Sequence, residues 1–237
     1  MQTLNLLVLY YSRHGATRQL AELIAEGIES VSGANAILRT VPSVSTVSEA
    51  VAAQIPPSGP PYAEYADLAN CDGLALGSPT RFGNMAAAMK FFLDGSTSEW
   101  LQGSLTGKPA CVFTSSSSMH GGQESTLLTM MIPLFHHGML LMGLPYSLPE
   151  LHHTSSGGTP YGVTHVAGSS NQLAISKDEQ SLAFAQGRQL AQYAQLLKQA
   201  KPNARWLSLN TLWTPTRKPC WWRPSYSACY VLPGNGF

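Results

Sequence analysis

The sequence is poor in charged residues. Asp, Glu, Lys and Arg make up 11% of its 237 residues, against roughly 25% in a typical globular chain. The charges are also uneven, because residues 1–200 hold all 13 acidic residues but only nine of the 14 basic ones. This body therefore has a net charge of −4 and lacks the broad basic surface that nucleic-acid binding needs. We expect no nucleic-acid partner.

Cysteine motifs and long apolar runs are absent as well. The four cysteines, Cys71, Cys111, Cys220 and Cys229, form no C-x-x-C pair, so neither zinc spacing nor a disulfide framework is indicated. No apolar run reaches the about 18 residues of a transmembrane helix, and the N-terminus has no signal-peptide pattern. We expect a cytoplasmic protein without stable membrane insertion.

The common signatures of nucleotide-binding and hydrolytic sites are missing too. No G-x-G-x-x-G follows a strand pattern, and no G-K-[ST] closes a phosphate loop. No Ser-His-Asp or paired-carboxylate arrangement is visible. His136 and His137 are adjacent and cannot share a helix face, so we expect no metal site. The sequence therefore does not predict a Rossmann dinucleotide site or a P-loop.

What is present is an alternation of strand and helix patterns. Apolar runs predict strands, and the spacing of apolar residues predicts helices between them. Residues 42–66 and 147–170 are rich in Pro, Gly and Ser, and we interpret both as irregular. Strands that alternate with helices predict an α/β fold, a doubly wound five-stranded parallel sheet with helices on both faces. The predicted strands are 5–12, 35–41, 71–79, 109–116 and 139–146, and the predicted helices are 17–32, 84–94, 124–138 and 176–199.

Polar loops follow three of the predicted strands. The first has the sequence SRHGAT, where backbone N–H groups, two hydroxyls and a helix N-terminus suit a phosphate. It comprises Ser12, Arg13, His14, Gly15, Ala16 and Thr17. The alternative is an ordinary capped connection between a strand and a helix.

The second and third loops are also rich in hydrogen-bond donors. In the second, Phe82 can cover an aromatic ligand and Arg81 can bind anions or carbonyl oxygens; in the third, hydroxyl side chains can line one edge of a heterocycle. Exposed turns are the alternative for both. The second loop is Pro79, Thr80, Arg81, Phe82, Gly83 and Asn84; the third is Ser115, Ser116, Ser117, Ser118, Met119, His120 and Gly121.

The three loops together favour a mononucleotide cofactor. Ligands of open α/β sheets bind at the carboxyl ends of the strands, and the flavodoxin-like strand order 2-1-3-4-5 places FMN there. Five stretches then resemble the tryptophan-repressor-binding-protein type (WrbA-type) NAD(P)H:quinone oxidoreductases over residues 4–200. They are YYSRHGAT, GSPTRFGNMAAAMKFFLD, GKPACVFTSSSSMHGGQES, LFHHGMLLMGLPY and GGTPYGVTHVAG.

The resemblance implies a flavodoxin-like domain over residues 1–200 with non-covalent FMN. It also implies two-electron reduction of a quinone by NADH or NADPH, and a homotetramer. The three loops would hold FMN, and His136 matches a position that reaches the flavin. His14 falls where the family contacts the nicotinamide nucleotide, and Trp100 matches a substrate-side aromatic from a neighbouring subunit. The alternatives are an FMN-binding electron carrier and a protein-interaction regulator.

The last 37 residues, 201–237, have no counterpart in this resemblance. They contain four of the five Trp residues, two of the cysteines and five Pro residues, without periodicity. Three explanations stay open: a disordered segment, an added segment, or a non-native end. We therefore expect function to reside in residues 1–200.

Overall fold

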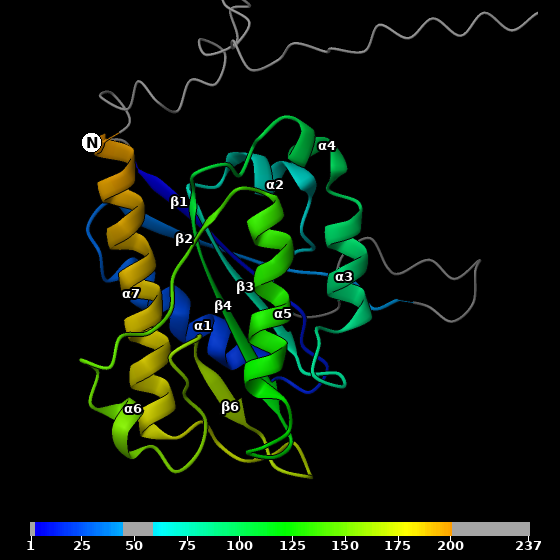
Figure 1. Ribbon diagram of the computed structural model, residues 1–237, viewed down its shortest axis with the longest axis vertical. Helices are drawn as coiled ribbons and strands as arrows, with labels where there is room; N and C mark the ends of the chain where they lie inside the picture. Colours follow the sequence, from blue (N-terminus) through cyan, green and yellow to red (C-terminus); the bar gives the residue numbers. More distant parts are fainter. Residues whose placement is uncertain (1–2, 45–58, 201–237) are drawn as a thin grey trace, which may run out of the picture. The chain divides into compact units, whose positions relative to one another are not determined.

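The computed structural model describes residues 3–44 and 59–200. Its sheet follows the order β2-β1-β3-β4-β5, with β6 paired to β4, and every pairing is parallel. The predicted flavodoxin-like order 2-1-3-4-5 is therefore confirmed (Figure 1). The strands are β1 (Leu4–Tyr10), β2 (Ala34–Thr40), β3 (Gly73–Pro79), β4 (Pro109–Ser116), β5 (Leu140–Leu141) and β6 (Thr164–Val166).

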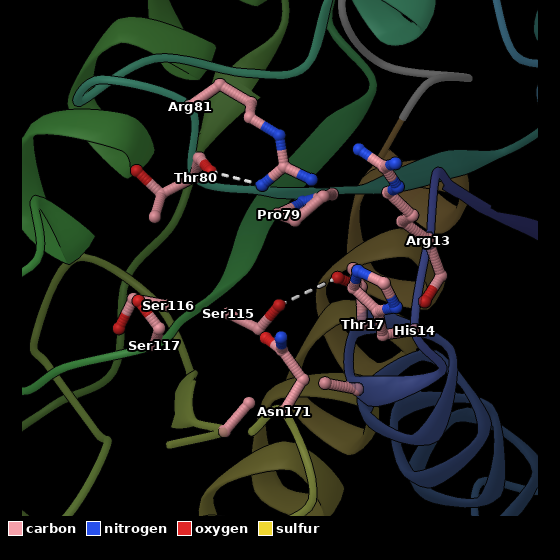
Figure 2. Close-up of a pocket in the computed structure, with 13 residues that line it drawn as sticks. Arg13, His14, Thr17, Pro79, Thr80, Arg81, Ser115, Ser116, Ser117 and Asn171 are labelled. Atoms are coloured by element: carbon pink, nitrogen blue, oxygen red, sulfur yellow. Dashed lines mark hydrogen bonds between the residues drawn. The ribbon is translucent and has the colours of Figure 1, made fainter. Parts of the chain in front are cut away.

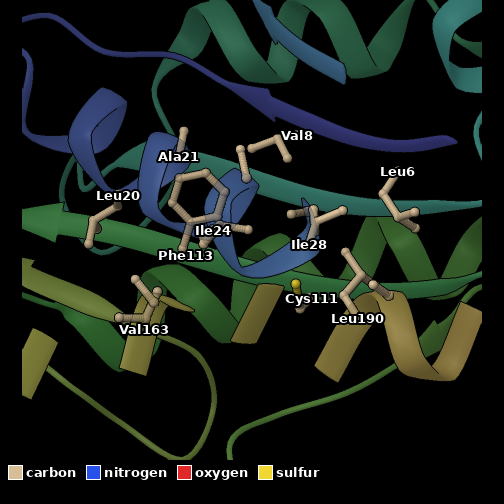
Figure 3. Close-up of a cluster of buried hydrophobic side chains, with 14 of the residues drawn as sticks. Leu6, Val8, Leu20, Ala21, Ile24, Ile28, Cys111, Phe113, Val163 and Leu190 are labelled. Atoms are coloured by element: carbon tan, nitrogen blue, oxygen red, sulfur yellow. The ribbon is translucent and has the colours of Figure 1, made fainter. Parts of the chain in front are cut away.

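Helices cover both faces of this sheet (Figure 1). Side chains alternate along each strand, so Leu6 and Val8 face a cluster that includes α1 and α7, while Leu7 and Leu9 face α3 and α5. Figure 3 shows the first cluster, where Leu20 and Ile24 of α1 pack near Phe113 of the sheet. The helices are α1 (Ala16–Glu29), α2 (Tyr65–Asn70), α3 (Ala87–Asp94), α4 (Thr97–Leu101), α5 (Gln123–His136), α6 (Glu150–His153) and α7 (Lys177–Ala200).

The central strands β3 and β4 have helices on both sides, and their apolar composition reflects this burial. Every residue of β3 and β4 is buried, which explains why both read as continuous apolar runs rather than as alternating patterns. Cys71 and Cys111 are buried free thiols and belong to the two core clusters. Burial raises the pKa of the Cys71 thiol to about 11 and that of Cys111 to about 12, so neither is a nucleophile at neutral pH.

The outer edge of the sheet differs from the prediction. The expected strand 139–146 forms only over Leu140–Leu141, and β6 arises inside the segment 147–170 that we expected to be irregular. Just beyond β5, the N–H of Leu144 donates to the carbonyl of Pro160 at 2.9 Å instead of to β4, and Gly143 packs so closely there that a Cβ would overlap the same oxygen. The chain therefore leaves the edge after β5, and β6 takes the place beside the second half of β4.

Three short helices were not predicted either: α2, α4 and α6 have six, five and four residues. Such lengths carry little apolar periodicity and form mainly through tertiary contacts and caps. Helix α2 has a capping box, in which the side chains of Glu64 and Asp67 accept each other's backbone N–H bonds. Part of the predicted excursion 42–66 and the whole tail 201–237 lie outside the described residues.

Helices α1 and α7 approach each other through two glycines. A Cβ on Gly27 of α1 would overlap the carbonyl oxygen of Phe184, and a Cβ on Gly187 of α7 would overlap that of Ile24. The contacts are reciprocal and involve backbone atoms, which cannot rotate away. This crossing sets the distance of α7 from α1.

Candidate functional site

A small cavity lies at the carboxyl ends of β1, β3 and β4, where the three predicted loops meet (Figure 2). Its volume is about 90 Å³. Backbone and hydroxyl groups dominate its walls, with Arg13 and Arg81 on either side of Pro79 in the view of Figure 2. The lining residues are Ser12, Arg13, His14, Ala16, Thr17, Pro79, Thr80, Arg81, Ser115, Ser116, Ser117, Ala167 and Asn171.

The N-terminus of α1 forms one wall of this cavity. Its N-cap is Gly15, with φ of 94°, and no side chain caps the helix. The hydroxyl of Ser12 accepts a bond from the N–H of Gly15 at 3.1 Å. The first N–H groups of any helix lack an intrahelical partner, and the first turn of α1 has no acidic residue. This end of the helix is therefore suited to an anion.

Hydrogen bonds between hydroxyl groups join the loops to one another. The hydroxyls of Thr17 and Ser115 lie 2.9 Å apart, which ties the first loop to the third. The N–H of Thr80 donates to the carbonyl of Ser115 at 2.9 Å, and its hydroxyl lies 2.6 Å from that of Thr126. The three loops are therefore joined by hydrogen bonds at the carboxyl edge of the sheet.

The second loop contains a strained turn. The N–H of Arg81 donates to the carbonyl of Asn84 at 2.7 Å, and the N–H of Asn84 returns a bond at 3.0 Å. Phe82 and Gly83 between them have φ of 53° and 76°, the pattern of a type I′ turn. Phenylalanine is costly in this conformation, yet the side chain of Phe82 is fully exposed. Strain combined with exposure of an aromatic ring indicates a binding role.

Some predicted residues lie in these loops without lining the cavity. Phe82 and Met119 are exposed large apolar side chains near its rim, and Gly122, just beyond the third loop, caps α5 with φ of 87°. Sequence reasoning missed Ala167 and Asn171, which belong to the segment predicted as irregular or just after it. Asn171 has φ of 55°; the Ser-Ser-Asn turn after Gly168 was the only signal for it.

Trp100 and His136 do not reach this cavity within one chain. They meet at the far end of α5, where the indole N–H of Trp100 donates to the carbonyl of His136 at 2.8 Å. A helix of 14 residues places its two ends roughly 20 Å apart. Both residues line a separate cavity of about 420 Å³, beside Ile132 and Pro133. His137, the next residue after His136, also lines this cavity. It is buried, and burial lowers the pKa of its imidazole.

A buried hydrogen-bond network surrounds the carboxylate of Glu179. Glu179 of α7 and His165 of β6 are both buried, and His165 Nδ1 lies 2.9 Å from Glu179 Oε2. Glu179 also accepts the N–H groups of Gly157, Val166 and Ser176 at 2.7–3.2 Å. Burial alone raises the pKa of Glu179, but the hydrogen bonds from His165, Ser176 and Ser156 outweigh burial and lower that pKa to about 2.

This depressed pKa predicts a specific loss of stability in acid. A carboxylate with a folded pKa near 2 and an ordinary value of 4.5 contributes stability that is present above pH 4.5 and is lost as pH falls toward 2. The contribution is about 3 kcal/mol. We expect urea unfolding at pH 7 to give a higher free energy of unfolding for the native chain than for Glu179→Gln. This difference should be smaller at pH 3. A difference of constant size would contradict this assignment.

Neither a metal centre nor a membrane span is found in residues 3–44 and 59–200. No three His, Cys, Asp or Glu side chains there gather as metal ligands. No helix in that part of the chain is long and apolar enough to cross a membrane.

Comparisons with known proteins match this geometry. The family model described as NADPH-dependent FMN reductase matches residues 4–152. A protein of Geobacter sulfurreducens named NAD(P)H dehydrogenase (quinone) is 42% identical over 81% of this chain and 98% of its own length. A protein of Solidesulfovibrio magneticus with the same name is 40% identical over 82% of this chain and all of its own.

Solved structures agree on the fold. A flavodoxin, WrbA-like protein from Agrobacterium tumefaciens superposes with a TM-score of 0.57 at 24% identity, over 82% of this chain and 99% of that one. Oxidised flavodoxin 1 from Bacillus cereus gives 0.52 at 17% identity, over 80% and 98%. The chain therefore belongs to the NADPH-dependent FMN reductase family and is similar over most of its length to proteins named NAD(P)H dehydrogenase (quinone).

Proposed function

We propose that this chain is an FMN-dependent enzyme that reduces quinones with NADH or NADPH. The observation that carries the proposal is the uncapped N-terminus of α1, which opens without a nearby acid into a polar cavity at the carboxyl edge of the sheet. Relatives about 40% identical over nearly their whole length are named NAD(P)H dehydrogenase (quinone). The family likeness and the site geometry support the same chemistry.

The residues of the cavity fit the phosphate end of FMN. At about 90 Å³ the cavity is far smaller than the roughly 300–1,000 Å³ of a pocket that encloses a drug-sized ligand. It therefore accommodates the phosphate, and the flavin ring would rest outside, between the loop of Arg81 and Phe82 and the loop of Ser115–Ser117. Neutral N–H and hydroxyl donors bind a phosphate without a paired cation.

FMN, when bound, supplies the redox chemistry, moving two electrons from NAD(P)H to a quinone. The chain's own residues would bind FMN and orient it. Ser12 and Gly15 shape the loop that presents the helix N-terminus, and Thr17 with Ser115 fixes the distance between two walls. Arg81, whose Nη1 donates to the carbonyl of Thr80 at 2.7 Å, brings a positive charge to the edge where a reduced flavin is negative. His14, in the first loop, is proposed to contact the nicotinamide nucleotide.

The strained turn gives a test of the ring contact. Asn tolerates positive φ far better than Phe, so Phe82→Asn is expected to raise the free energy of unfolding by about 1 kcal/mol. It also removes the exposed ring, and FMN affinity should fall about tenfold, which corresponds to about 1.4 kcal/mol. Urea unfolding without FMN and flavin-fluorescence titration measure the two effects. If affinity is unchanged, Phe82 does not contact the flavin.

We further propose that the enzyme is a cytoplasmic homotetramer and that residues 1–200 are its FMN-binding domain. Trp100 and His136 lie together on an exposed cavity roughly 20 Å along α5 from the FMN loops. The roles that the resemblance implies for them need a second copy to bring this cavity to the flavin. Light scattering of the FMN-loaded protein measures the assembly. A loaded monomer with full activity would contradict both roles.

The decisive experiment is spectroscopic and kinetic. Protein loaded with FMN and mixed anaerobically with NADH or NADPH is expected to lose its absorption near 450 nm within the turnover time, and 1,4-benzoquinone should restore it. Steady-state rates with both substrates varied should give the parallel lines of a ping-pong reaction. A protein that binds FMN but is not reduced by either nucleotide would instead be an electron carrier.

A further inference from the structure

The hydrogen bonds of His165 determine its charge. Its Nδ1 lies 2.9 Å from Glu179 Oε2, and its Nε2 lies 3.1 Å from the backbone carbonyl of Leu173. An ionised carboxylate and a carbonyl oxygen can only accept hydrogen bonds. Glu179 is ionised, because Gly157 and Ser176 donate backbone N–H groups to its two oxygens. Both ring nitrogens of His165 therefore face acceptors, an arrangement that only an imidazolium satisfies with two donated hydrogen bonds.

The carbonyl that His165 holds belongs to a loop of the FMN site. The N–H of Leu173 donates to the carbonyl of Ala167 at 3.0 Å, which closes the loop 167–173. Ala167 and Asn171 of this loop line the proposed phosphate cavity together with Ala16 and Thr17 from the start of α1. A second cavity of about 240 Å³ lies next to it, lined by His165 as well as by His14 and Ala16. His165 thus links α7 to the wall formed by Ala167 and Asn171, which does not belong to any of the three predicted loops.

We propose that His165 is a positioning residue for the FMN phosphate: as an imidazolium it ties the carbonyl of Leu173 to the carboxylate of Glu179 and so holds the loop 167–173 against the anion site. This inference rests on FMN binding, as proposed above. It goes further in assigning a role to a residue outside the three loops, and in requiring that residue to carry a proton.

Loss of this proton has two consequences for the site. The lone pair of Nε2 would face the lone pairs of the Leu173 carbonyl, so the loop would lose its anchor. The carboxylate of Glu179 would also lose its counter-ion and would add a negative charge behind an anion site. The other titratable group facing His165 is His14, across the second cavity. Asp178, beside Glu179 in α7, is engaged by His153 at 3.5 Å.

The experiment compares FMN with riboflavin, which lacks the phosphate. Dissociation constants come from flavin-fluorescence titrations of the full chain and of His165→Gln at pH 7.5, above the second pKa of the phosphate. We expect His165→Gln to weaken FMN binding about tenfold and riboflavin binding less than twofold.

A measurement on the native chain isolates the proton on His165. In the native chain with ¹⁵N-labelled histidine, one buried imidazole should show two protonated nitrogens at pH 7.5, and this measurement requires no folded variant. A neutral imidazole at position 165 would overturn the proposal, as would equal weakening of FMN and riboflavin. If the native chain binds no FMN, the proposed function fails instead, and the NMR result still reports on His165.

Discussion

Replacing Ala16 with Glu is expected to separate the stability of the apoprotein from its affinity for FMN. Ala16 is the first residue of α1 and lines the cavity that we propose for the FMN phosphate. A carboxylate there interacts favourably with the helix dipole, so the free energy of unfolding without FMN should rise by about 0.3–1 kcal/mol. The same carboxylate repels a phosphate about 5 Å away by about 3 kcal/mol. We therefore expect FMN affinity to fall at least 100-fold.

Ala16→Gln is the matched control, because it adds nearly the same volume without the charge. It should lower FMN affinity by much less than Ala16→Glu does. The two variants should bind riboflavin with similar affinities. Urea unfolding and flavin-fluorescence titration provide the measurements. If Glu and Gln weaken FMN equally, the cavity rejects bulk rather than charge, and α1 is not a phosphate site.

The second large effect is expected at the crossing of α1 and α7. Gly187→Ala would normally favour a helix by about 1 kcal/mol, but its Cβ would overlap the carbonyl oxygen of Ile24. The helices must separate, and Leu182, Leu190 and their neighbours would lose part of their packing in the core. We expect the free energy of unfolding to fall by about 3 kcal/mol.

Ser181→Ala provides the comparison within the same helix, because Ser181 is exposed. This variant should have the same free energy of unfolding as the native chain or a slightly higher one. Urea unfolding of the apoprotein measures both variants. A Gly187→Ala protein as stable as the Ser181→Ala protein would show that the two helices can move apart without cost.

The strands that position the site could be predicted because parallel strands buried on both faces leave continuous apolar runs. Residues 73–79 and 109–116 are of this kind, and the polar loops after them could be placed at one edge by the rule for such sheets. The outer edge could not be predicted. The sequence MLLMGLPY is apolar throughout, whereas β5 ends at Leu141 and the contacts of Gly143 and Leu144 with Pro160 beyond it are tertiary.

The candidate site divides in the same way. Loops that follow strands were identified from residue types, whereas Asn171 reaches the cavity only because β6 pairs with β4. His165 and Glu179 were not singled out, since 14 residues separate them in the chain and neither belongs to a recognisable motif. Nothing in the sequence shows that Trp100 and His136 share a cavity at the other end of α5. Such pairings depend on tertiary structure.

The wall formed by Ala167 and Asn171 has a consequence for biosynthesis. The first loop leaves the ribosome about 150 residues before this wall, and the anchoring helix α7 ends only at Ala200. A nascent chain that stops before β6 lacks the complete phosphate cavity, even though the strands of its other three walls have emerged. The complete cavity can therefore form only after the ribosome has passed Asn171.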